Sequence, residues 1–330
     1  MKRKRKMNYG RTCFWILLII VVIALGCNTV SHFFSVDMDK LSEDISTPLS
    51  GREQENALPA KTQEPVVLDS SKRELHSPYA LLVRLKDKKV AFEARSRERI
   101  YPASLTKIMT AVVAIENISD LQELVELPKK IFPDLYKADA SMAGFLPGEK
   151  VPAIDLLYGA LLPSGAEASI GLALKVSGSE SKFVKRMNEK AKQFGMDDTH
   201  FTNVCGLHDS KHYTTAKDMA ALLEYALKNK TFRKVFTASR HSTAGTNLHP
   251  DGITFYSTLF GKMEDSEFPG GKILGGKTGY TEESGLCLAS LAEKNGVEYI
   301  LITAGAPGDH RTEQYNIKDA LMVYGNYLKK

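Results

Sequence analysis

The stretch Tyr101-Pro102-Ala103-Ser104-Leu105-Thr106-Lys107 leads directly into Ile108-Met109-Thr110-Ala111-Val112-Val113-Ala114-Ile115. Pro102 suits the first turn of a helix and could not continue one. From Leu105 onward nearly every position is apolar, so we expect a helix that is buried on most sides. Ser104 and Lys107 are three residues apart, which places both side chains on one face of that helix. A buried lysine bonded to a serine hydroxyl is a candidate base for a nucleophile, although Ser-x-x-Lys alone occurs by chance in many proteins.

The whole chain has the composition of a globular protein with a substantial core. Its 330 residues are 43% hydrophobic and 25% charged, and the net charge is +5. Part of that charge lies in an N-terminal basic cluster, formed by Lys2, Arg3, Lys4, Arg5, Lys6 and Arg11. Because the rest of the chain is close to neutral, its charge gives no indication of a nucleic-acid partner.

An apolar run over residues 13–27 follows the basic cluster, and mildly polar residues extend it. We expect residues 13–36 to be an uncleaved membrane anchor. The basic residues before it predict that residues 1–12 are cytoplasmic and the rest extracytoplasmic, which makes this a single-pass protein of the cell membrane. A cleaved signal peptide, followed by secretion, has the same layout. Ala24-Leu25-Gly26-Cys27 also loosely resembles a lipoprotein processing site at Cys27.

Beyond the apolar run the chain divides into a linker and one domain. Residues 37–77 are polar, lack aromatic side chains and show no sustained periodicity, so we expect a flexible linker. Residues 78–330 form the predicted domain. We expect strands at 79–85, 90–94, 276–280, 285–292 and 299–305, and helices at 151–162, 166–176, 180–194, 215–227 and 316–328.

Turn and capping signals support these assignments. Lys294-Asn295-Gly296 predicts a hairpin turn, Gly195 predicts a helix end, and Thr214 or Thr215 predicts a helix cap. Strands at both ends of the domain enclose a mainly helical block from about residue 121 to 229. The predicted fold class is therefore α+β, with an antiparallel sheet flanked by helices, and with the terminal strands meeting in that sheet.

Two further stretches carry candidate functional residues. Leu161-Leu162-Pro163-Ser164-Gly165 predicts a tight turn between apolar helices that presents a hydroxyl group, and a helix cap is the alternative interpretation. Gly275-Gly276-Lys277-Thr278-Gly279-Tyr280-Thr281 predicts a strand in which glycine allows a ligand or another backbone to come close. A bulged strand with a solvated lysine is the alternative there.

The cysteines and histidines give weaker signals. Cys287 is expected to be a buried strand residue, and a disulfide between Cys205 and Cys287 stays open as an alternative. His200, His208 and His212 are close in sequence, but their spacing matches no strong zinc pattern. We therefore expect no metal and no cofactor.

The order Ser-x-x-Lys, Ser-Gly-x, Lys-Thr-Gly resembles that of the active-site-serine penicillin-binding proteins and their β-lactamase relatives. The chain is similar to the D-alanyl-D-alanine carboxypeptidases of the low-molecular-mass penicillin-binding kind. Residues 99–111 resemble that family's first box and 276–285 its third box, while 199–203, 206–207 and 213–220 resemble its intermediate signature. The resemblance runs from about residue 78 to the C-terminus and implies a β-lactamase/transpeptidase-like fold.

The resemblance implies roles for the first two boxes. Ser104 would be the nucleophile that attacks the carbonyl of the penultimate D-alanine, giving an acyl-enzyme that water hydrolyses. Lys107 would accept the hydroxyl proton, and both burial and the neighbouring Lys277 should lower the pKa of its amine. Ser164 would relay protons between the lysines and the leaving amine.

The third box would bind the substrate. The backbone N–H groups of Ser104 and Tyr280 would form the oxyanion hole. Lys277 and Thr278 would bind the terminal carboxylate, and Gly279 would leave room for its close approach. In this family an arginine after the third box can assist at the carboxylate, and Arg311 is the candidate by position. A surface-loop arginine is the alternative.

One position departs from the family pattern. The second box is usually Ser-Gly-Asn, whose amide holds the substrate backbone and the lysine, but here Ala166 stands in that place. Glu167 follows and offers a carboxylate instead. The C-terminal β-domain that many relatives carry is also not expected, because the chain ends soon after the last predicted helix.

The predicted function is that of a membrane-anchored serine D,D-carboxypeptidase that trims the terminal D-alanine from peptidoglycan stem peptides. Its expected partners are stem peptides ending in D-Ala-D-Ala, β-lactams as covalent inhibitors, and the membrane. One alternative is β-lactamase or D,D-endopeptidase activity at the same site, for which Glu167 would be a candidate deacylating base. The other is a non-catalytic cell-wall-binding homologue in which Ala166 marks decay.

Overall fold

The computed structural model describes residues 75–326. The predicted tail (1–12), the membrane segment (13–36) and all but the last three residues of the linker (37–77) lie outside that range. Within it, no helix is long and apolar enough to cross a membrane. The backbone N–H groups of His76 and Ser77 donate to the carboxylate of Asp319 at 3.1 and 2.7 Å. The final residues of the predicted linker therefore belong to the domain.

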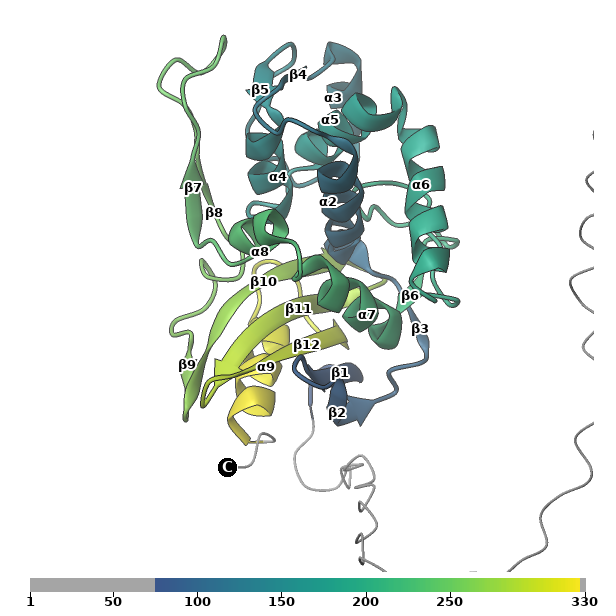
Figure 1. The fold of residues 1–330 in the computed structure, drawn as a ribbon, viewed down its shortest axis with the longest axis vertical. Coiled ribbons are helices and arrows are strands. Elements are labelled where there is room, and N and C mark those ends of the chain that lie inside the picture. The colour runs from purple at the N-terminus through teal and green to yellow at the C-terminus, as the bar shows by residue number, and fades with distance from the viewer. Residues whose placement is uncertain (1–74, 327–330) are drawn as a thin grey trace, which may run out of the picture. The chain divides into compact units, whose positions relative to one another are not determined.

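A six-stranded antiparallel sheet forms one half of the domain, with the strand order β2-β1-β12-β11-β10-β9 (Figure 1). Its strands are β1 Tyr79–Arg84, β2 Lys89–Ala94, β9 Glu267–Phe268, β10 Gly271–Thr281, β11 Gly285–Lys294 and β12 Val297–Ala306. The first strand pairs with the last, as predicted, from Tyr79 opposite Ala304 to Arg84 opposite Tyr299. The predicted hairpin turn is also present, and Asn295 and Gly296 both take the positive φ that such a turn requires.

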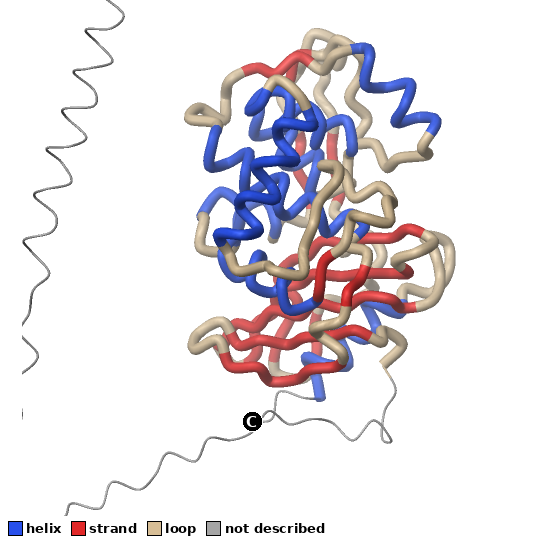
Figure 2. The backbone as a smooth tube through the Cα atoms, turned by 90° about the vertical axis from the view of Figure 1, so that its right-hand side faces the viewer, coloured by secondary structure: helices blue, strands red, loops and turns tan. Residues whose placement is uncertain are grey.

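Helices fill the other half and cover both faces of the sheet (Figures 1 and 2). They are α2 Thr106–Asn117, α3 Phe132–Lys137, α4 Ala153–Leu161, α5 Ala166–Ser177, α6 Glu180–Gln193, α7 Ala216–Ala226, α8 Lys230–Phe236 and α9 Tyr315–Asn326, with the 3-10 turns η1 Ala103–Leu105 and η2 Lys129–Ile131. Short strand pairs join the segments between them: β3 Arg99–Ile100 with β6 Thr214–Thr215, β4 Leu124–Glu126 with β5 Lys150–Pro152, and β7 Arg240–Ser242 with β8 Thr254–Tyr256. The predicted α+β class is confirmed.

The sheet separates two hydrophobic cores because its side chains alternate in direction. Leu81 and Val83 of β1 belong to the larger core, together with the helical block. Ala80 and Leu82 belong to the smaller core, which includes Tyr324 of α9. The sheet is therefore buried on both faces, and β10, at the edge next to β9, brings its side chains up to the helical block.

Several local predictions are confirmed, and some are corrected. The Thr215 side chain accepts from the N–H of Asp218 at the start of α7, and Gly195 takes a positive φ just after α6. The helix predicted over 151–162 begins instead at Ala153, because Lys150–Pro152 pairs with β4. Sequence analysis assigned no element to residues 230–270, where α8, β7, β8 and β9 lie. Cys205 and Cys287 are both buried free thiols, so the disulfide alternative is excluded.

Candidate active site

Ser104 lies in η1, one helical turn before Lys107 in α2. The Lys107 ammonium nitrogen (Nζ) is 3.1 Å from Ser104 Oγ and 2.7 Å from the carbonyl oxygen of Cys205. Lys107 is only 2% exposed, whereas Ser104 is half-buried and reachable from outside. Ala103 has a positive φ of 46°, a strained value for alanine, which lets the turn present the hydroxyl at the start of the helix.

Burial lowers the pKa of Lys107, which favours the neutral amine that a base requires. The charges that act on this pKa are those of Cys205 and Glu167, and both raise it. The expected repulsion between the two lysines acts on Lys277. Burial, then the charge of Lys107, then that of Lys262 lower the pKa of Lys277 well below its usual value. Burial and mutual repulsion therefore both disfavour a state in which the two lysines are charged together.

The strand β10 forms one wall of the site, with Lys277, Thr278 and Gly279 at its centre. Lys277 is fully buried, and its Nζ donates to the carbonyl oxygen of Thr278 at 2.8 Å. A Cβ atom at Gly279 would lie 3.1 Å from the backbone nitrogen of Ser104 and 3.2 Å from Ala103 Cβ. This is the close backbone approach that the glycine in the strand predicted. We call residues 277–280 the strand wall.

The opposite side, which we call the helical wall, consists of residues 164–167 at the junction of α4 and α5. Ser164 takes a positive φ of 73°. Its Oγ is buried and has no hydrogen-bond partner within residues 75–326. Gly165, and not Ser164, occupies the cap position of α5, and no side chain caps that helix. The capping alternative for Ser164 is therefore excluded, and its buried hydroxyl is not used by a contact within residues 75–326.

Ala166 and Glu167 complete the helical wall. The N–H of Ala166 donates to the carbonyl oxygen of Ser141 at 2.8 Å. Glu167 is fully buried, and its Oε1 accepts from the N–H groups of residues 143, 144 and 145 at 2.7, 2.9 and 3.3 Å. Burial raises the pKa of Glu167, while these backbone donors oppose the shift. The second-box amide is thus replaced by a methyl group beside a carboxylate that binds backbone.

Thr258, which was not predicted from the sequence, joins the strand wall to the end of α4. Thr258 Oγ1 is 2.6 Å from Thr278 Oγ1, and the N–H of Thr258 donates to the carbonyl oxygen of Leu162 at 3.1 Å. The residue follows β8 and so depends on the hairpin whose strands were not predicted. No local sequence signal identifies it, because its role comes from two long-range contacts.

The 203–207 loop lies behind the nucleophile and presents the carbonyl that Lys107 binds. Asn203 Oδ1 accepts from the N–H groups of Cys205, Gly206 and Leu207 at 3.1, 2.7 and 3.1 Å. Gly206 has a φ of 82°, and a Cβ atom there would lie 1.8 Å from the carbonyl oxygen of Ala103. The intermediate signature therefore specifies a loop that only glycine allows to pack against the Ser104 turn.

The three histidines of this region serve separate contacts. His212 is buried, with its ring nitrogens 2.8 Å from Thr106 Oγ1 and 3.0 Å from the N–H of Thr202. Burial lowers the pKa of His212 to about 4, so the ring is neutral. His200 bonds to the carbonyl oxygen of Lys211, and His208 lies 3.5 Å from Glu283. Within the described range, no group of three or more metal-ligating side chains converges.

The structure places Arg311 on the surface. Its side chain is 92% exposed and lies 4.0 Å from the Asp309 carboxylate, so its role at the substrate carboxylate stays a prediction.

Lys262 is a second cation, and its charge acts on Lys277 of the strand wall. Its Nζ is 3.4 Å from the carbonyl oxygen of His310 and 3.2 Å from Gln314 Oε1, and its charge lowers the pKa of Lys277 after burial and Lys107. The His310 ring packs edge-on against Tyr280.

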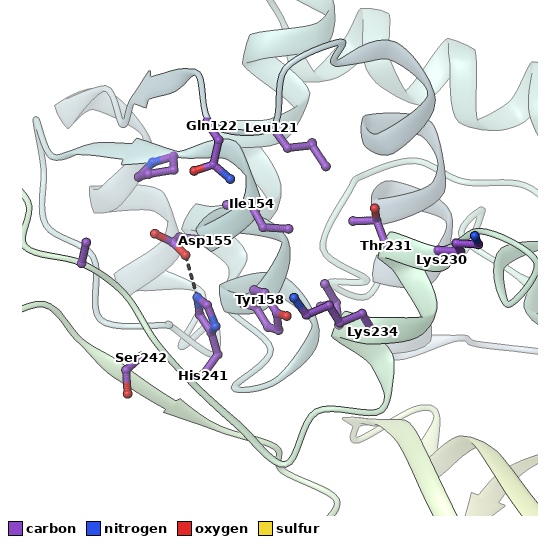
Figure 3. A pocket seen from close by; sticks show the side chains of 13 residues that line it. Leu121, Gln122, Ile154, Asp155, Tyr158, Lys230, Thr231, Lys234, His241 and Ser242 are labelled. Atoms are coloured by element: carbon purple, nitrogen blue, oxygen red, sulfur yellow. Dashed lines mark hydrogen bonds and ion pairs between the residues drawn. The ribbon is translucent and has the colours of Figure 1, made fainter.

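A separate groove of about 700 Å³ lies between α4, α8 and the β7 strand (Figure 3). His241 Nε2 is 2.6 Å from Asp155 Oδ1, and the His241 ring stacks on Tyr158 with 3.6 Å between centroids. The residues that line the groove include neither Ser104 nor Lys107. Its carboxylate and imidazole are bonded to each other, whereas Lys107 and Lys277 bond to carbonyl oxygens and to no carboxylate among residues 75–326.

Comparison with known proteins agrees with this geometry. The family model for D-alanyl-D-alanine carboxypeptidases matches residues 66–308. The chain belongs to the D-alanyl-D-alanine carboxypeptidase family. The resemblance read from the three boxes is thereby confirmed.

Curated relatives include carboxypeptidase DacF of Bacillus subtilis, 35% identical over 69% of this chain and 57% of its own length. Another is DacC of Escherichia coli, 30% identical over 72% of this chain and 58% of its own length. The chain therefore spans somewhat more than half the length of these relatives. Among solved structures, the Streptomyces K15 DD-transpeptidase is 26% identical with a TM-score of 0.69, over 78% of this chain and all of that one.

Proposed function

We propose that this protein is a serine-type D-Ala-D-Ala carboxypeptidase that removes the terminal D-alanine of peptidoglycan stem peptides. The observation that carries the proposal is the contact of 3.1 Å between Lys107 Nζ and Ser104 Oγ, between the strand wall and the helical wall. Family membership supports the same conclusion. Burial and the lowered pKa of Lys107 allow a neutral amine to act as the base.

In the acylation step, Ser104 Oγ attacks the carbonyl carbon of the penultimate D-alanine while Lys107 accepts the hydroxyl proton. The new C–O bond gives a tetrahedral intermediate whose oxyanion accepts from the N–H groups of Ser104 and Tyr280. The C–N bond then breaks, and the leaving amine takes a proton that Ser164 relays from Lys107. The terminal D-alanine departs, and the remaining peptide stays as an ester on Ser104.

The strand wall orients the substrate. The terminal carboxylate is bound by Lys277 and by the Thr278 hydroxyl, which Thr258 holds at 2.6 Å. A carboxylate favours protonation of Lys277, because an opposite charge raises a lysine pKa against the effect of burial. Arg311 assists from its loop, and Lys262 adds positive charge on the same side.

Water completes the reaction by attacking the ester carbonyl carbon, while Lys107 accepts the proton of water. The C–O bond to Ser104 then breaks, and Lys107 returns the proton to Ser104 Oγ. Glu167 is a poor candidate for a dedicated deacylating base, because the side chain is fully buried and three backbone N–H groups hold one of its oxygens in place. This observation weighs against the β-lactamase alternative. A D,D-endopeptidase would use the same acyl-enzyme chemistry on a cross-linked peptide.

The N-terminal part of the proposal rests on the sequence. We propose that residues 13–36 anchor the protein in the cell membrane as a single pass, with the catalytic domain extracytoplasmic. The basic cluster before the apolar run supports this orientation. Secretion after signal cleavage and lipid attachment at Cys27 are the alternatives. Mass spectrometry of the N-terminus of the cellular protein distinguishes the three.

The function is tested by incubating the protein with an acylated tripeptide that ends in D-Ala-D-Ala. The expected result is stoichiometric release of D-alanine, which Ser104→Ala abolishes. Turnover of a chromogenic β-lactam with no release of D-alanine would favour the β-lactamase alternative. Binding of the peptide without release would favour a non-catalytic homologue and contradict the proposal.

A further inference from the structure

Glu167 stands beside the position where the second-box amide is missing, and it is fully buried. We propose that Glu167 is a positioning residue of the active site, which holds the 141–145 loop against the helical wall and carries a carboxylate on the segment that contacts Cys205, whose carbonyl oxygen binds Lys107. The inference rests on the proposed acylation of Ser104. It assigns Glu167 neither a contact with the substrate nor the deacylating role considered above.

Glu167 holds the 141–145 loop through backbone hydrogen bonds. The N–H groups of Ala143, Gly144 and Phe145 converge on the single oxygen Oε1, an arrangement of successive backbone donors that binds an anion. The loop touches the Ser164 turn directly, because a Cβ atom at Gly165 would lie 2.6 Å from Ala143 Cβ. Loss of the carboxylate would therefore release the loop at the edge of the catalytic serines.

A second buried carboxylate shows what a purely structural role looks like. Glu149 is also fully buried, and both its oxygens have partners. Its Oε2 accepts from the N–H of Leu146 at 2.7 Å, and its Oε1 lies 2.6 Å from Thr246 Oγ1 and 2.9 Å from His249 Nδ1. By contrast, Glu167 Oε2 is buried and has no partner within the described residues. An unpaired buried oxygen costs stability, which a structural role alone does not explain.

Glu167 also contributes to the electrostatic environment of Lys107. Lys107 interacts electrostatically with four titratable groups. They are Glu167 from α5, Cys205 from the 203–207 loop, His212, and Lys277 from β10. Burial raises the pKa of Cys205 to about 12, so this side chain is a neutral thiol. His212 is neutral because burial lowers its pKa to about 4. Among these groups, Glu167 is therefore the acidic side chain whose charge favours protonated Lys107. Its segment lies close to Lys107, because Cys205 Sγ is 3.6 Å from the carbonyl oxygen of Ala166 while the Cys205 carbonyl oxygen accepts from Lys107.

The sign of the effect can be tested. An anionic Glu167 raises the pKa of Lys107, so its removal should lower that pKa and make the neutral base available at lower pH. Glu167→Gln removes the charge and keeps the size of the side chain. Glu167→Asp keeps the charge but is one methylene too short to bind all three loop N–H groups. The two variants therefore separate the two parts of the inference.

The experiment measures the rate of acylation of the full chain, in detergent, by a fluorescent penicillin between pH 5 and pH 10. We expect the rate of the unmodified protein to rise with pH as Lys107 loses its proton. In Glu167→Gln this rise should move to lower pH by about one unit. In Glu167→Asp the rise should stay in place while the plateau rate falls about tenfold. The control Glu149→Gln should lower the melting temperature and leave the midpoint of the rise unchanged.

If the acylation rate of Glu167→Gln rises at the same pH as that of the unmodified protein, Glu167 does not set the pKa of Lys107. If the plateau rate of Glu167→Asp is unchanged, Glu167 does not position the 141–145 loop for acylation. If the unmodified protein is not acylated at any pH, the proposed function fails instead. If either variant does not fold, hydrogen exchange of the backbone amides in the unmodified protein tests whether Glu167 holds the loop. We expect the protection of residues 143–145, corrected for intrinsic rates, to fall as Glu167 is protonated, and protection independent of pH would overturn the inference.

Discussion

The strand wall and the helical wall lie on either side of Ser104 but are built differently. Residues 277–280 belong to a long strand whose register opposite β11 is continuous from Gly275 to Thr281. Residues 164–167 instead form a turn with a positive φ at Ser164 and then the first turn of α5. The sheet fixes the positions of Lys277 and Thr278 through backbone bonds. The helical wall depends on a few side-chain contacts, above all that of Glu167.

The comparison indicates where sequence change is tolerated. On the strand wall a side chain added at Gly279 would meet the backbone of Ser104, so this wall has little freedom. On the helical wall Ala166 stands where the second box usually has asparagine, while Ser164 is present. We therefore infer that the lysines and the strand wall supply the chemistry, and that the helical wall tunes the position of the substrate.

The largest effect on the acylation rate is expected for substitution of Lys107. Lys107→Met removes the base and replaces a buried amine with an apolar side chain of similar length. Acylation by penicillin should slow by about a hundred- to ten-thousand-fold, with the fold retained. The matched control is Lys294→Met, which removes a lysine that is also largely buried but bonds to the carbonyl oxygens of Tyr324 and Gly325. Equal acylation rates in the two variants would refute the assignment of Lys107.

Glycine replacements compare how closely the Ser104 turn is packed. Gly206→Ala should destabilise the protein by about 3 kcal/mol or more, because the new methyl group would overlap the carbonyl oxygen of Ala103. Gly178→Ala is the control, since its φ is also positive but nothing lies within 4 Å, and it should cost about 1 kcal/mol. Gly279→Ala should destabilise less than Gly206→Ala and slow acylation about tenfold. Urea unfolding measures the loss of stability in each variant. Equal losses in Gly178→Ala and Gly206→Ala would show that packing against the Ser104 turn is unimportant.

Restoring the missing amide tests the helical wall. In Ala166→Asn we expect kcat/KM for the peptide to rise about tenfold, which corresponds to one added hydrogen bond to the substrate. Stability should fall by about 1–3 kcal/mol, because the new side chain enters a packed position. Ala166→Val adds volume without the amide and should lower stability without raising kcat/KM. If the valine and asparagine variants have the same kinetics, the wall does not position the substrate through this residue.

The stability of the strand wall should depend on pH. The pKa of Lys277 is lowered well below its usual value by burial, then by Lys107 and Lys262, so the unfolded chain binds more protons than the folded one. The free energy of unfolding should therefore rise with pH between the folded pKa of Lys277 and its unfolded value near 10.5. Lys277→Met should flatten this rise in urea unfolding at several pH values. An unchanged slope would mean that folding does not lower the pKa of Lys277.

The smallest effects are expected where the third box meets the surface. Lys262→Ala should raise KM for the peptide about threefold, because it removes positive charge beside the carboxylate site. Arg311→Ala should raise KM less, since the Arg311 side chain is 92% exposed. Lys318→Ala, at an exposed ion pair with Glu313, is the control for removal of a surface charge. A larger effect at Arg311 than at Lys262 would show that the arginine moves onto the substrate.

The parts of the site that follow from short sequence spacing were predictable. Ser104 and Lys107 meet because they are one helical turn apart, and the Asn295-Gly296 hairpin and the Thr215 cap depend on their own neighbours. Thr258, Lys262 and Glu149 were missed because their roles come from contacts with distant segments. The start of α8 did have a local signal, since the Asn229 side chain accepts from the N–H of Phe232 at 3.0 Å. The positive φ at Ser164 has no such signal and follows from packing between α4 and α5.

The most direct test of the central claim is mass spectrometry after incubation with a labelled penicillin. We expect one covalent adduct per chain, located on Ser104 in the tryptic peptide of residues 100–107, and absent in Ser104→Ala. A folded protein that forms no adduct, or one that carries the label on another residue, would contradict it.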